Sequence, residues 1–498
     1  MSPRLPAPLS LWVDTAPAPD RGGRPLPVQA EVVVIGAGIA GLTTAYLLAA
    51  AGRSVLVLEA GAVGAGVSGH TTAKVTAQHA LAYSTLKSRK DKRGGAIAAA
   101  TYGQAQSAAL DWIARTSAEV EIDCAFTRQD SFVYVTDPAR LDRLRAEAEA
   151  AEEAGLPASL VGGEEIVPPL GAAGAVRFTG QAQFHPRRWL LGLAERIEQL
   201  GGRIVEGIRV TQVEERGIVH TPRGRVRGRD VVVATHYPIL DRGLFFARLN
   251  PVRDLAVAGP GAAVDGMYLD ADTHRSLRGY DGFLVVGGEH YRTGEDIDVE
   301  GRYSRLAQAA LELGMTRLTH RWSAHDMSTL DSVPYVGRYH PAARHLWVAT
   351  GFGQWGMTGG TAAGLLLDEL IRGGDPPAAA LFDPNRFDAP SAVALAKDNV
   401  AVARHLVGGY VGAATSTGTP EGLRPGEATV TRRGSRFVAG YRTEDGELRT
   451  VSARCTHLGC LVAFNNAEKT WDCPCHGSRF STDGTVIQGP ATAPLSPA

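Results

Sequence analysis

The sequence has no excess of charge of either sign. Its 498 residues include 51 Lys and Arg against 52 Asp and Glu, which leaves a formal net charge of −1. Nucleic-acid-binding proteins usually carry a basic footprint that this composition does not supply. We therefore expect no nucleic-acid partner. Apolar residues make up 44% of the chain, near the globular norm, so the chain can bury large cores.

Long apolar runs are also missing. No stretch approaches the roughly 18 uncharged apolar residues that a membrane span requires. Residues 1–24 are rich in Pro and Arg and lack the apolar segment of a secretory signal. The sequence therefore predicts a cytoplasmic protein without an integral membrane anchor.

Cysteine is scarce, with five residues in the whole chain, which excludes a disulfide-rich scaffold. Four of the five nevertheless lie between Cys455 and Cys475. Such crowding indicates a local chemical role for these four. Cys124 lies far from them, and we expect it to be a buried, inert thiol.

The segment EVVVIGAGIAGLTTAYLLAAAGRSVLVLEAG predicts a strand, a glycine turn, a helix and a second strand. It follows an N-terminal arm that we assign to residues 1–30. Two later sections, residues 201–239 and 345–371, also contain apolar strand patterns. A doubly wound sheet assembled from these distant segments accommodates all three.

The remaining segments predict further parts of the fold. Helical patterns at residues 141–155 and 302–314, with a strand around 283–287, would contribute to a second lobe. A helix-like stretch and a Ser/Thr/Gly/Pro linker occupy residues 386–421. Short strands separated by turn signals such as EDGE and TDGT then predict a small all-β module at residues 422–498.

The glycine turn after the first strand has the spacing G-x-G-x-x-G. Gly36 permits a tight turn, Gly38 allows close approach of a pyrophosphate, and Gly41 lets the helix pack on the strand. The N-terminus of the helix would present free N–H groups to the phosphates. Glu59 ends the second strand and is placed to bind ribose hydroxyls. The pattern predicts a dinucleotide site, and a turn used for packing alone is the alternative.

This fingerprint alone does not distinguish FAD from NAD(P). We find no second strand followed by such a glycine turn, whereas enzymes that pass hydride from NAD(P)H to a flavin commonly carry two. A single site beside a large second lobe favours FAD that is reduced directly by an organic substrate.

Three motifs extend this interpretation: GAGIAGLTTAYLLAAAGRSVLVLEA, LDSVPYVGR and VATGFGQWGMTGGTAAGLLLDEL. Through them the chain resembles the FAD-dependent amine and amino-acid oxidoreductases of the D-amino-acid oxidase type, including glycine and sarcosine oxidases. The resemblance implies an α/β, two-lobed domain at residues 31–385, with a Rossmann-like FAD lobe. Its mixed-sheet substrate lobe would take roughly residues 81–175 and 241–325. The flavin would lie between the lobes and accept hydride from a C–H next to nitrogen.

The same resemblance implies which residues contact FAD. They are Gly36, Ala37, Gly38, Ile39, Ala40, Gly41, Glu59, Ala60, Ser68, Gly69, His70, Thr71, Thr72, Lys74, Val210, Ala234, Gly353, Trp355, Gly356, Met357 and Thr358. A helix that begins within residues 353–358 would stabilise an anionic reduced flavin by the positive field of its N-terminus. An ordinary glycine-rich helix start is the alternative.

Asp326 departs from the family pattern. Many members that bind carboxylates carry W-x-x-x-R-x-x-T-x-D, and here Asp326 stands in the place of the arginine. Since the carboxylate of Asp326 would repel the carboxylate of a substrate, we expect a cationic or neutral amine as substrate. Arg278 is a second candidate substrate contact, with an exposed surface arginine as the alternative. The sequence does not identify a catalytic base.

His70 lies where some relatives attach the flavin covalently. It therefore predicts either an 8α-linkage to the flavin or a hydrogen bond from a neutral imidazole. Acid precipitation distinguishes the two, because it releases the flavin only when no covalent bond holds it.

The C-terminal cysteines belong to a pattern that contains two histidines. Cys455 and His457 form C-x-H, and after fifteen intervening residues Cys473 and His476 form C-x-x-H. This arrangement resembles a Rieske domain, in which two Cys bind one iron and two His bind the other iron of a [2Fe-2S] cluster. The resemblance implies these four residues as the ligands. A structural zinc site with the same donors is the alternative.

The resemblance also assigns the neighbours of the ligands. Cys460 and Cys475 match a pair that forms a disulfide between the two ligand loops in cytochrome bc-type Rieske proteins. Ser478 matches a serine that donates a hydrogen bond to a bridging sulfide. Phe480 stands where high-potential members often have tyrosine, so we expect a lower potential than theirs.

Together the two sites predict a relay. A substrate would reduce FAD by two electrons, and a one-electron cluster would pass them singly to an external acceptor that the sequence does not identify. One alternative is an electron-transfer module that feeds an oxygenase or a respiratory partner. Another is a redox sensor that uses the pair Cys460 and Cys475.

We expect the purified protein to contain iron and acid-labile sulfide in equal amounts, because a [2Fe-2S] cluster holds two of each. Metal analysis and a sulfide assay provide the measurement. Stoichiometric zinc without sulfide would instead identify the structural zinc site.

Overall fold

The structure is a computed structural model that describes residues 5–498 apart from 90–93, 296–297, 387–405, 407 and 416–417. Most of the segment predicted as a helix and linker, residues 386–421, lies outside the described residues. Within it, residues 408–415 are helical. No helix in the described ranges is long and apolar enough to cross a membrane. The cytoplasmic location stays a prediction.

The first sheet contains the predicted β–α–β unit. Strand β1 (Gln29–Ile35) leads through α2 (Ile39–Ala50) to β2 (Val55–Leu58), and the two strands pair in parallel. The strand order is β16-β17-β10-β1-β2-β7, so distant segments share one sheet, as predicted. The other strands are β7 (Arg203–Val205), β8 (Gln212–Val213), β9 (Ile218–Thr221), β10 (Gly224–Val233), β16 (Tyr335–Arg338) and β17 (Leu346–Thr350).

Helices pack closely against this sheet. The additional helices around it are α4 (Ala96–Glu119), α6 (Pro186–Gln199), α8 (Gly356–Ile371) and α9 (Ala379–Phe382). A Cβ on Gly360 would lie 2.5 Å from Cγ2 of Ile39, and a Cβ on Gly364 would lie 2.5 Å from Cγ2 of Thr43. Glycine at these two positions therefore lets α8 approach α2 closely.

The second sheet builds the other lobe and has the order β15-β11-β14-β13-β12-β4-β6-β3, with β5 beside β6. It is mixed, as predicted, because β12 and β4 pair in parallel among antiparallel neighbours. Its strands are β3 (Lys74–Val75), β4 (Thr127–Val135), β5 (Ala158–Gly162), β6 (Gly174–Gln183), β11 (Leu249–Pro260), β12 (Met267–Asp270), β13 (Ser276–Tyr280), β14 (Phe283–Arg292) and β15 (His320–Thr329). The accompanying helices are α3 (Ala82–Ser88), α5 (Leu141–Glu153) and α7 (Val299–Glu312).

The N-terminal arm is packed into the two-lobed domain. Helix α1 (Leu11–Asp14) buries Trp12 completely. The indole Nε1 donates a hydrogen bond of 2.7 Å to the carbonyl of Thr71, and Oγ of Ser10 donates one of 2.7 Å to the carbonyl of Gly69. The arm therefore supports the segment that the sequence assigns to FAD binding.

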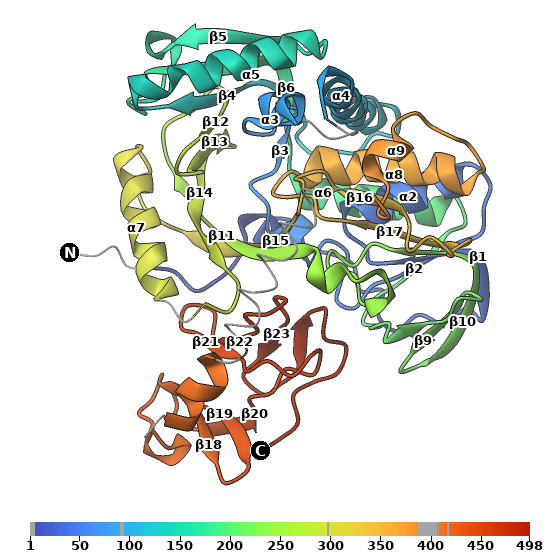
Figure 1. The fold of residues 1–498 in the computed structure, drawn as a ribbon, viewed down its shortest axis with the longest axis vertical. Coiled ribbons are helices and arrows are strands. Elements are labelled where there is room, and N and C mark those ends of the chain that lie inside the picture. Colours follow the sequence, from blue (N-terminus) through green and yellow to red (C-terminus); the bar gives the residue numbers. More distant parts are fainter. Residues whose placement is uncertain (1–4, 90–93, 296–297, 387–405, 407, 416–417) are drawn as a thin grey trace.

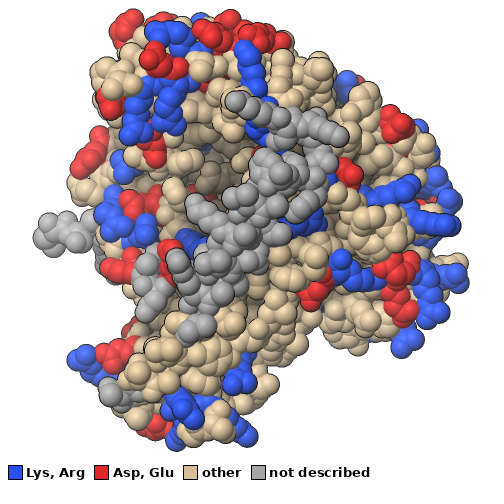
Figure 2. Space-filling view, in the orientation of Figure 1, with Lys and Arg blue, Asp and Glu red and all other residues tan. Residues whose placement is uncertain are grey.

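The C-terminal module (β18–β24) is all-β, as predicted. One sheet contains β18 (Ala428–Arg433), β19 (Arg436–Arg442) and β20 (Leu448–Ser452). The other contains β21 (Ala463–Asn465), β22 (Thr470–Asp472), β23 (Arg479–Ser481) and β24 (Val486–Gln488). Figure 1 shows the module, in orange and red, below β11 and β15 of the two-lobed domain. In Figure 2, basic and acidic side chains lie next to one another around the rim of the visible face.

A buried ion network joins the C-terminal module to the two-lobed domain. Arg253 on β11 forms a salt bridge of 2.8 Å with Glu468, and the side chain of Arg253 is 1% exposed. Glu468 also bonds Arg479 and accepts a hydrogen bond from Ser323 on β15. Arg479 bonds Asp472 at 3.0 Å. Buried charges are tolerated when opposite charges surround them, and here each arginine faces at least one carboxylate, although Nε and Nη1 of Arg253 have no hydrogen-bond partner.

The network controls the ionisation of Glu468. Burial alone would raise the pKa of its carboxyl group, but Arg253 and Arg479 lower that pKa to about 2. A carboxyl group whose pKa falls on folding stabilises the folded state at pH values above its unfolded pKa. The contribution of Glu468 is therefore complete above about pH 4.3, the ordinary value for Glu. It is lost as the pH falls toward 2.

Glu468→Gln should lower the free energy of unfolding by about 3 kcal/mol at neutral pH, because it leaves two buried arginines without their shared partner. Urea unfolding measures this value, and the difference from the wild type should shrink below about pH 4.3. Glu444→Gln is the matched control, since the side chain of Glu444 is 72% exposed and lies 3.6 Å from Lys469. If both substitutions lowered the free energy of unfolding equally, the buried network would contribute no more stability than an exposed ion pair.

Candidate flavin and cluster sites

A cavity lies between the two lobes. The first sheet contributes the glycine turn and the ends of β2 and β10, and the second sheet contributes residues of β11, β13, β14 and β15. The walls thus come from elements far apart in the sequence. This is the place where the sequence predicts FAD.

The glycine turn fits a dinucleotide. Gly36 has a φ of +107°, and a Cβ there would lie 2.4 Å from the carbonyl oxygen of Ala234. A Cβ on Gly41 would lie 2.0 Å from the carbonyl oxygen of Gly36. No side chain caps α2 at Gly38, although Oγ of Ser68 accepts a hydrogen bond of 3.1 Å from N of Ile39. The first turn of α2 therefore presents backbone N–H groups to the cavity, as pyrophosphate binding requires.

Glu59 supports this turn from the end of β2. Its carboxylate accepts hydrogen bonds of 2.7 Å from the backbone N of Ala37 and of Gly61. Burial raises the pKa of Glu59, while the two backbone donors and Arg209 oppose the rise. Each carboxylate oxygen keeps a second lone pair, so Glu59 can also accept a hydrogen bond from a ribose hydroxyl.

Most residues predicted to contact FAD line the cavity. They are Gly36, Ala37, Gly38, Ile39, Ala40, Glu59, Ala60, Ser68, His70, Thr71, Thr72, Lys74, Val210, Ala234, Trp355, Gly356 and Met357. The other predicted contacts, Gly41, Gly69, Gly353 and Thr358, are not among the residues of the wall. Thr358 instead donates a hydrogen bond of 2.9 Å to the carbonyl of Thr76.

Helix α8 begins at the cavity. Gly356 and Met357, its first two residues, line the wall, so the N-terminal end of the helix is next to the cavity, as the sequence predicts. Trp355 stacks on His79, with ring centroids 4.6 Å apart. Burial lowers the pKa of His79 to about 3, so this imidazole is neutral. No motif in the sequence pointed to His79.

His70 also lines the cavity. Its Nδ1 lies 2.9 Å from the carbonyl oxygen of Gly66, and burial lowers its pKa. A neutral imidazole in the wall is compatible with either of the two predicted states. The covalent linkage stays a prediction.

Two carboxylates line the part of the cavity next to the second sheet. Asp326 accepts a hydrogen bond of 2.7 Å from N of Met327 and another from N of Gln354, and burial raises its pKa to about 7. Asp254 accepts a hydrogen bond of 2.8 Å from Nε2 of Gln354, and burial raises its pKa also. Asp254 was not predicted as a site residue, although an acidic residue within the apolar pattern of β11 is a signal in the sequence.

Arg278 is completely buried, so the alternative of an exposed surface arginine is wrong. Its guanidinium lies 4.9 Å from the ring centroid of Trp12 and donates a hydrogen bond of 3.2 Å to the carbonyl of Phe184. It is not among the residues that line the cavity. Lys74 does line it, and burial together with Arg278 lowers the pKa of Lys74 to about 7.

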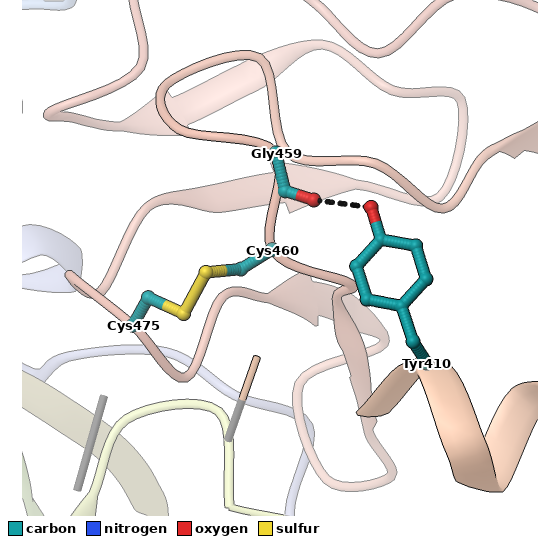
Figure 3. The surroundings of a disulfide bond; sticks show 4 residues. All are labelled: Tyr410, Gly459, Cys460 and Cys475. Atoms are coloured by element: carbon teal, nitrogen blue, oxygen red, sulfur yellow. Dashed lines mark hydrogen bonds between the residues drawn. A yellow bond between two sulfur atoms is a disulfide. The ribbon is translucent and has the colours of Figure 1, made fainter. Parts of the chain in front are cut away.

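The two cysteine loops of the C-terminal module meet. Cys460 and Cys475 form the predicted disulfide, which joins the loops, and the hydroxyl of Tyr410 donates a hydrogen bond of 2.8 Å to the carbonyl of Gly459 beside it (Figure 3). Cys455 and Cys473 are free and buried. Cys124 is free and buried too, and burial raises its pKa to about 11, so its thiol is protonated.

The histidines of these loops are arranged like ligands. The rings of His457 and His476 are 5.0 Å apart. Nδ1 of His457 is buried without a hydrogen-bond partner, as expected for a nitrogen that binds a metal. The free thiols and this unpartnered nitrogen fit the predicted [2Fe-2S] cluster. Ser478 accepts a hydrogen bond of 3.0 Å from N of Ala491 and also hydrogen-bonds the side chain of Cys455, so its hydroxyl lies next to a predicted ligand of the cluster.

The two-lobed domain covers the histidines. Nε2 of His457 lies 3.0 Å from Oδ1 of Asp241. The ring of Phe246 lies 6.4 Å from the ring of His457 and 5.8 Å from that of His476. The cluster loops therefore face the two-lobed domain.

The C-terminal module also completes the predicted FAD cavity. Ile487, Gln488, Gly489 and Thr492 form part of its wall. Nη2 of Arg209 donates a hydrogen bond of 2.9 Å to the carbonyl of Val486 and holds this edge in place. The sequence predicted two separate sites and missed this shared wall.

Comparisons with known proteins agree with both sites. Residues 31–370 match the family "FAD dependent oxidoreductase", and residues 415–497 match the family "Rieske [2Fe-2S] domain". The chain belongs to the FAD-dependent oxidoreductase family and carries a C-terminal Rieske domain. These two groups bind FAD and a [2Fe-2S] cluster, respectively.

One relative shares the whole architecture. The "Putative Rieske 2Fe-2S iron-sulfur protein YhfW" of Bacillus subtilis (strain 168) is 34% identical over 502 residues, which cover 98% of this chain and 97% of that protein. The cytochrome b6-f complex iron-sulfur subunit of Chlorobaculum tepidum is 52% identical over 50 residues, which cover 10% of this chain and 28% of the subunit.

Solved structures share the fold of the two-lobed domain. Glycine oxidase from Geobacillus kaustophilus has a TM-score of 0.62 at 19% identity, with 73% of this chain and 100% of that chain covered. L-proline dehydrogenase from P. horikoshii has a TM-score of 0.60 at 22% identity, with 73% of this chain and 98% of that chain covered.

Gly38→Ala should weaken FAD binding roughly tenfold, or about 1.4 kcal/mol. The reason is that the new Cβ would lie 3.1 Å from Oγ of Ser68, at the turn expected to receive the pyrophosphate. Titration of the apoprotein with FAD measures the affinity. Gly23→Ala is the control, because a Cβ there meets nothing within 4 Å. Unchanged affinity in Gly38→Ala would contradict the placement of the pyrophosphate.

Proposed function

We propose that this oxidoreductase oxidises an amine at FAD and passes the electrons one at a time through the Rieske cluster to an external acceptor. The observation that carries the proposal is the shared wall. Gln488 and its neighbours from the C-terminal module line the same cavity as the glycine turn of the FAD lobe. A module that completes the flavin cavity is well placed to take electrons from it.

The charges in the cavity favour an amine as substrate. Asp254 and Asp326 line it next to the second sheet. Among the described residues of the wall, the arginine is Arg209, which interacts with Glu59 in the same FAD lobe. The lysine is Lys74 of β3, and burial together with Arg278 lowers its pKa to about 7, which weakens its positive charge at neutral pH. A cationic amine is attracted by the carboxylates, whereas a substrate carboxylate would meet no arginine from the second sheet.

The names of proteins with the same fold agree with oxidation of a C–N bond. They include glycine oxidase, L-proline dehydrogenase and iminodiacetate oxidase. FAD, when bound, accepts a hydride from the carbon next to nitrogen. The first turn of α2 would hold the pyrophosphate of FAD, and Gln354 keeps Asp254 and the turn before α8 together.

The overall reaction balances with a one-electron acceptor. An amine with a C–H next to its N–H becomes an imine, which releases two electrons and two protons. A [2Fe-2S] cluster held by Cys455, Cys473, His457 and His476 would carry these electrons one at a time, each to one acceptor molecule. Two acceptor molecules are consumed for each amine, and the two protons go to solvent.

Candidate amines should bleach the flavin absorbance of the anaerobic holoprotein and then produce the EPR signal of the reduced cluster. Secondary and cyclic amines without a carboxylate should bleach it faster than the amino acids of the same skeleton, because the wall near Asp254 and Asp326 is acidic.

Two outcomes would contradict the proposal. Bleaching that requires a reductase protein would support an electron-transfer module instead. A flavin reduced by amine while the cluster stays EPR-silent would show that the two centres do not exchange electrons.

A further inference from the structure

Strands β11 and β15 lie between part of the predicted flavin cavity and the cluster loop around Gly477 in the C-terminal module. They pair antiparallel, with Arg253 opposite His325 and Asp254 opposite Ala324. We call this pair of strands the partition. The side chains of successive residues in a strand point to opposite faces of the sheet. Each strand of the partition therefore contributes side chains both to the cavity and to the contact with the C-terminal module.

The two faces of the partition have different partners. Asp254, Ala324 and Asp326 line the cavity. On the opposite face, Arg253 and Ser323 bond Glu468 of the C-terminal module. His325, which lies on this second face, is 2% exposed and packs against the cluster loop.

The contact between His325 and the cluster loop is unusually close. A Cβ on Gly477 would lie only 2.6 Å from Nε2 of His325, and the φ of Gly477 is +77°. Glycine is therefore required at position 477 for two reasons, the backbone conformation and the approach of the imidazole. Gly477 directly follows His476, a predicted ligand of the cluster.

His325 also touches a residue of the cavity wall. Its ring centroid lies 5.6 Å from that of His236, at an interplanar angle of 63°. His236 lines the cavity and lies just beyond β10. His236 in the cavity wall thus contacts His325, and His325 packs against Gly477, which is next to the predicted ligand His476.

We propose that His325 is the residue through which single electrons cross the partition from the flavin to the cluster. This inference rests on the proposed function and names the route that the function requires. Electron tunnelling between two centres becomes steeply slower with distance and is faster through packed atoms than across a gap. His325 supplies packed atoms between the wall of the cavity and the backbone next to a cluster ligand.

The electrons balance as in the overall reaction. Each passage oxidises the reduced flavin by one electron and reduces one ferric iron to ferrous iron. His325 gains and loses nothing in the net reaction. It is a positioning residue, since it acts through the two groups it contacts.

The experiment follows electron transfer in the anaerobic holoprotein after a laser flash with a deazaflavin reductant. Transient absorbance records reoxidation of the flavin and reduction of the cluster, so no substrate is needed. In His325→Leu, the transfer rate should fall roughly tenfold, because the smaller side chain leaves a gap between the cavity wall and the cluster loop. Flavin content, iron content, both midpoint potentials and the EPR g-values should stay as in the wild type.

Three further variants separate the bridging role from a structural one. His325→Phe keeps a ring in the contact with Gly477 and should retain most of the rate, whereas His325→Gln should be slow. His320→Leu removes the same ring from the same strand. His320 is buried but contacts Asp14 at 3.1 Å, on the side of α1, so this control should transfer at the wild-type rate.

The outcomes distinguish the two proposals. Wild-type rates in both His325→Leu and His325→Gln, with both cofactors retained, would overturn the role of His325 and leave the relay intact. If His325→Leu loses its cluster, the comparison of His325→Phe with His325→Gln decides, and equal rates in these two overturn the inference. If the wild type itself transfers no electron from flavin to cluster, the proposed function fails.

Discussion

The buried bond between Arg253 and Glu468 is the constraint on which the arrangement of the two predicted redox sites depends. It joins β11 of the two-lobed domain to the C-terminal module, and Arg479 and Ser323 complete it. Charges removed from water must find opposite charges in a specific geometry, so such a network favours one orientation of the module strongly over others. That orientation brings the cysteine loops to the two-lobed domain and the β24 segment to the cavity.

The partition of β11 and β15 makes one structural element serve two kinds of chemistry. Its cavity face carries the carboxylates of Asp254 and Asp326, which give the wall an acidic character. Its other face carries Arg253 and His325, which contact the C-terminal module. The alternation of side chains along a strand therefore places acidic residues in the cavity wall on one side and contacts with the C-terminal module on the other.

Local patterns in the sequence predicted much of the fold. The β–α–β unit, the helix later seen as α5 and the shared sheet of distant segments were all confirmed, because apolar periodicity and glycine spacing express local geometry. The disulfide of Cys460 and Cys475 was predicted from a family resemblance and was also confirmed. The burial of Arg278 was not predicted, since the aromatic groups around it come from separate segments: Trp12 from the arm and Tyr280 from β13.

What the sequence by itself determined is the chemistry of each module: a glycine turn for a dinucleotide, and paired thiols and imidazoles for a cluster. Such motifs are short and depend on residues close together in the chain, so they can be recognised from the sequence alone. Only the tertiary structure decided that Gln488 lines the predicted flavin cavity, that Asp254 faces it and that His325 meets Gly477. These contacts join residues distant in the chain, and they exist because strand register and the burial of Arg253 with Glu468 bring the two modules together.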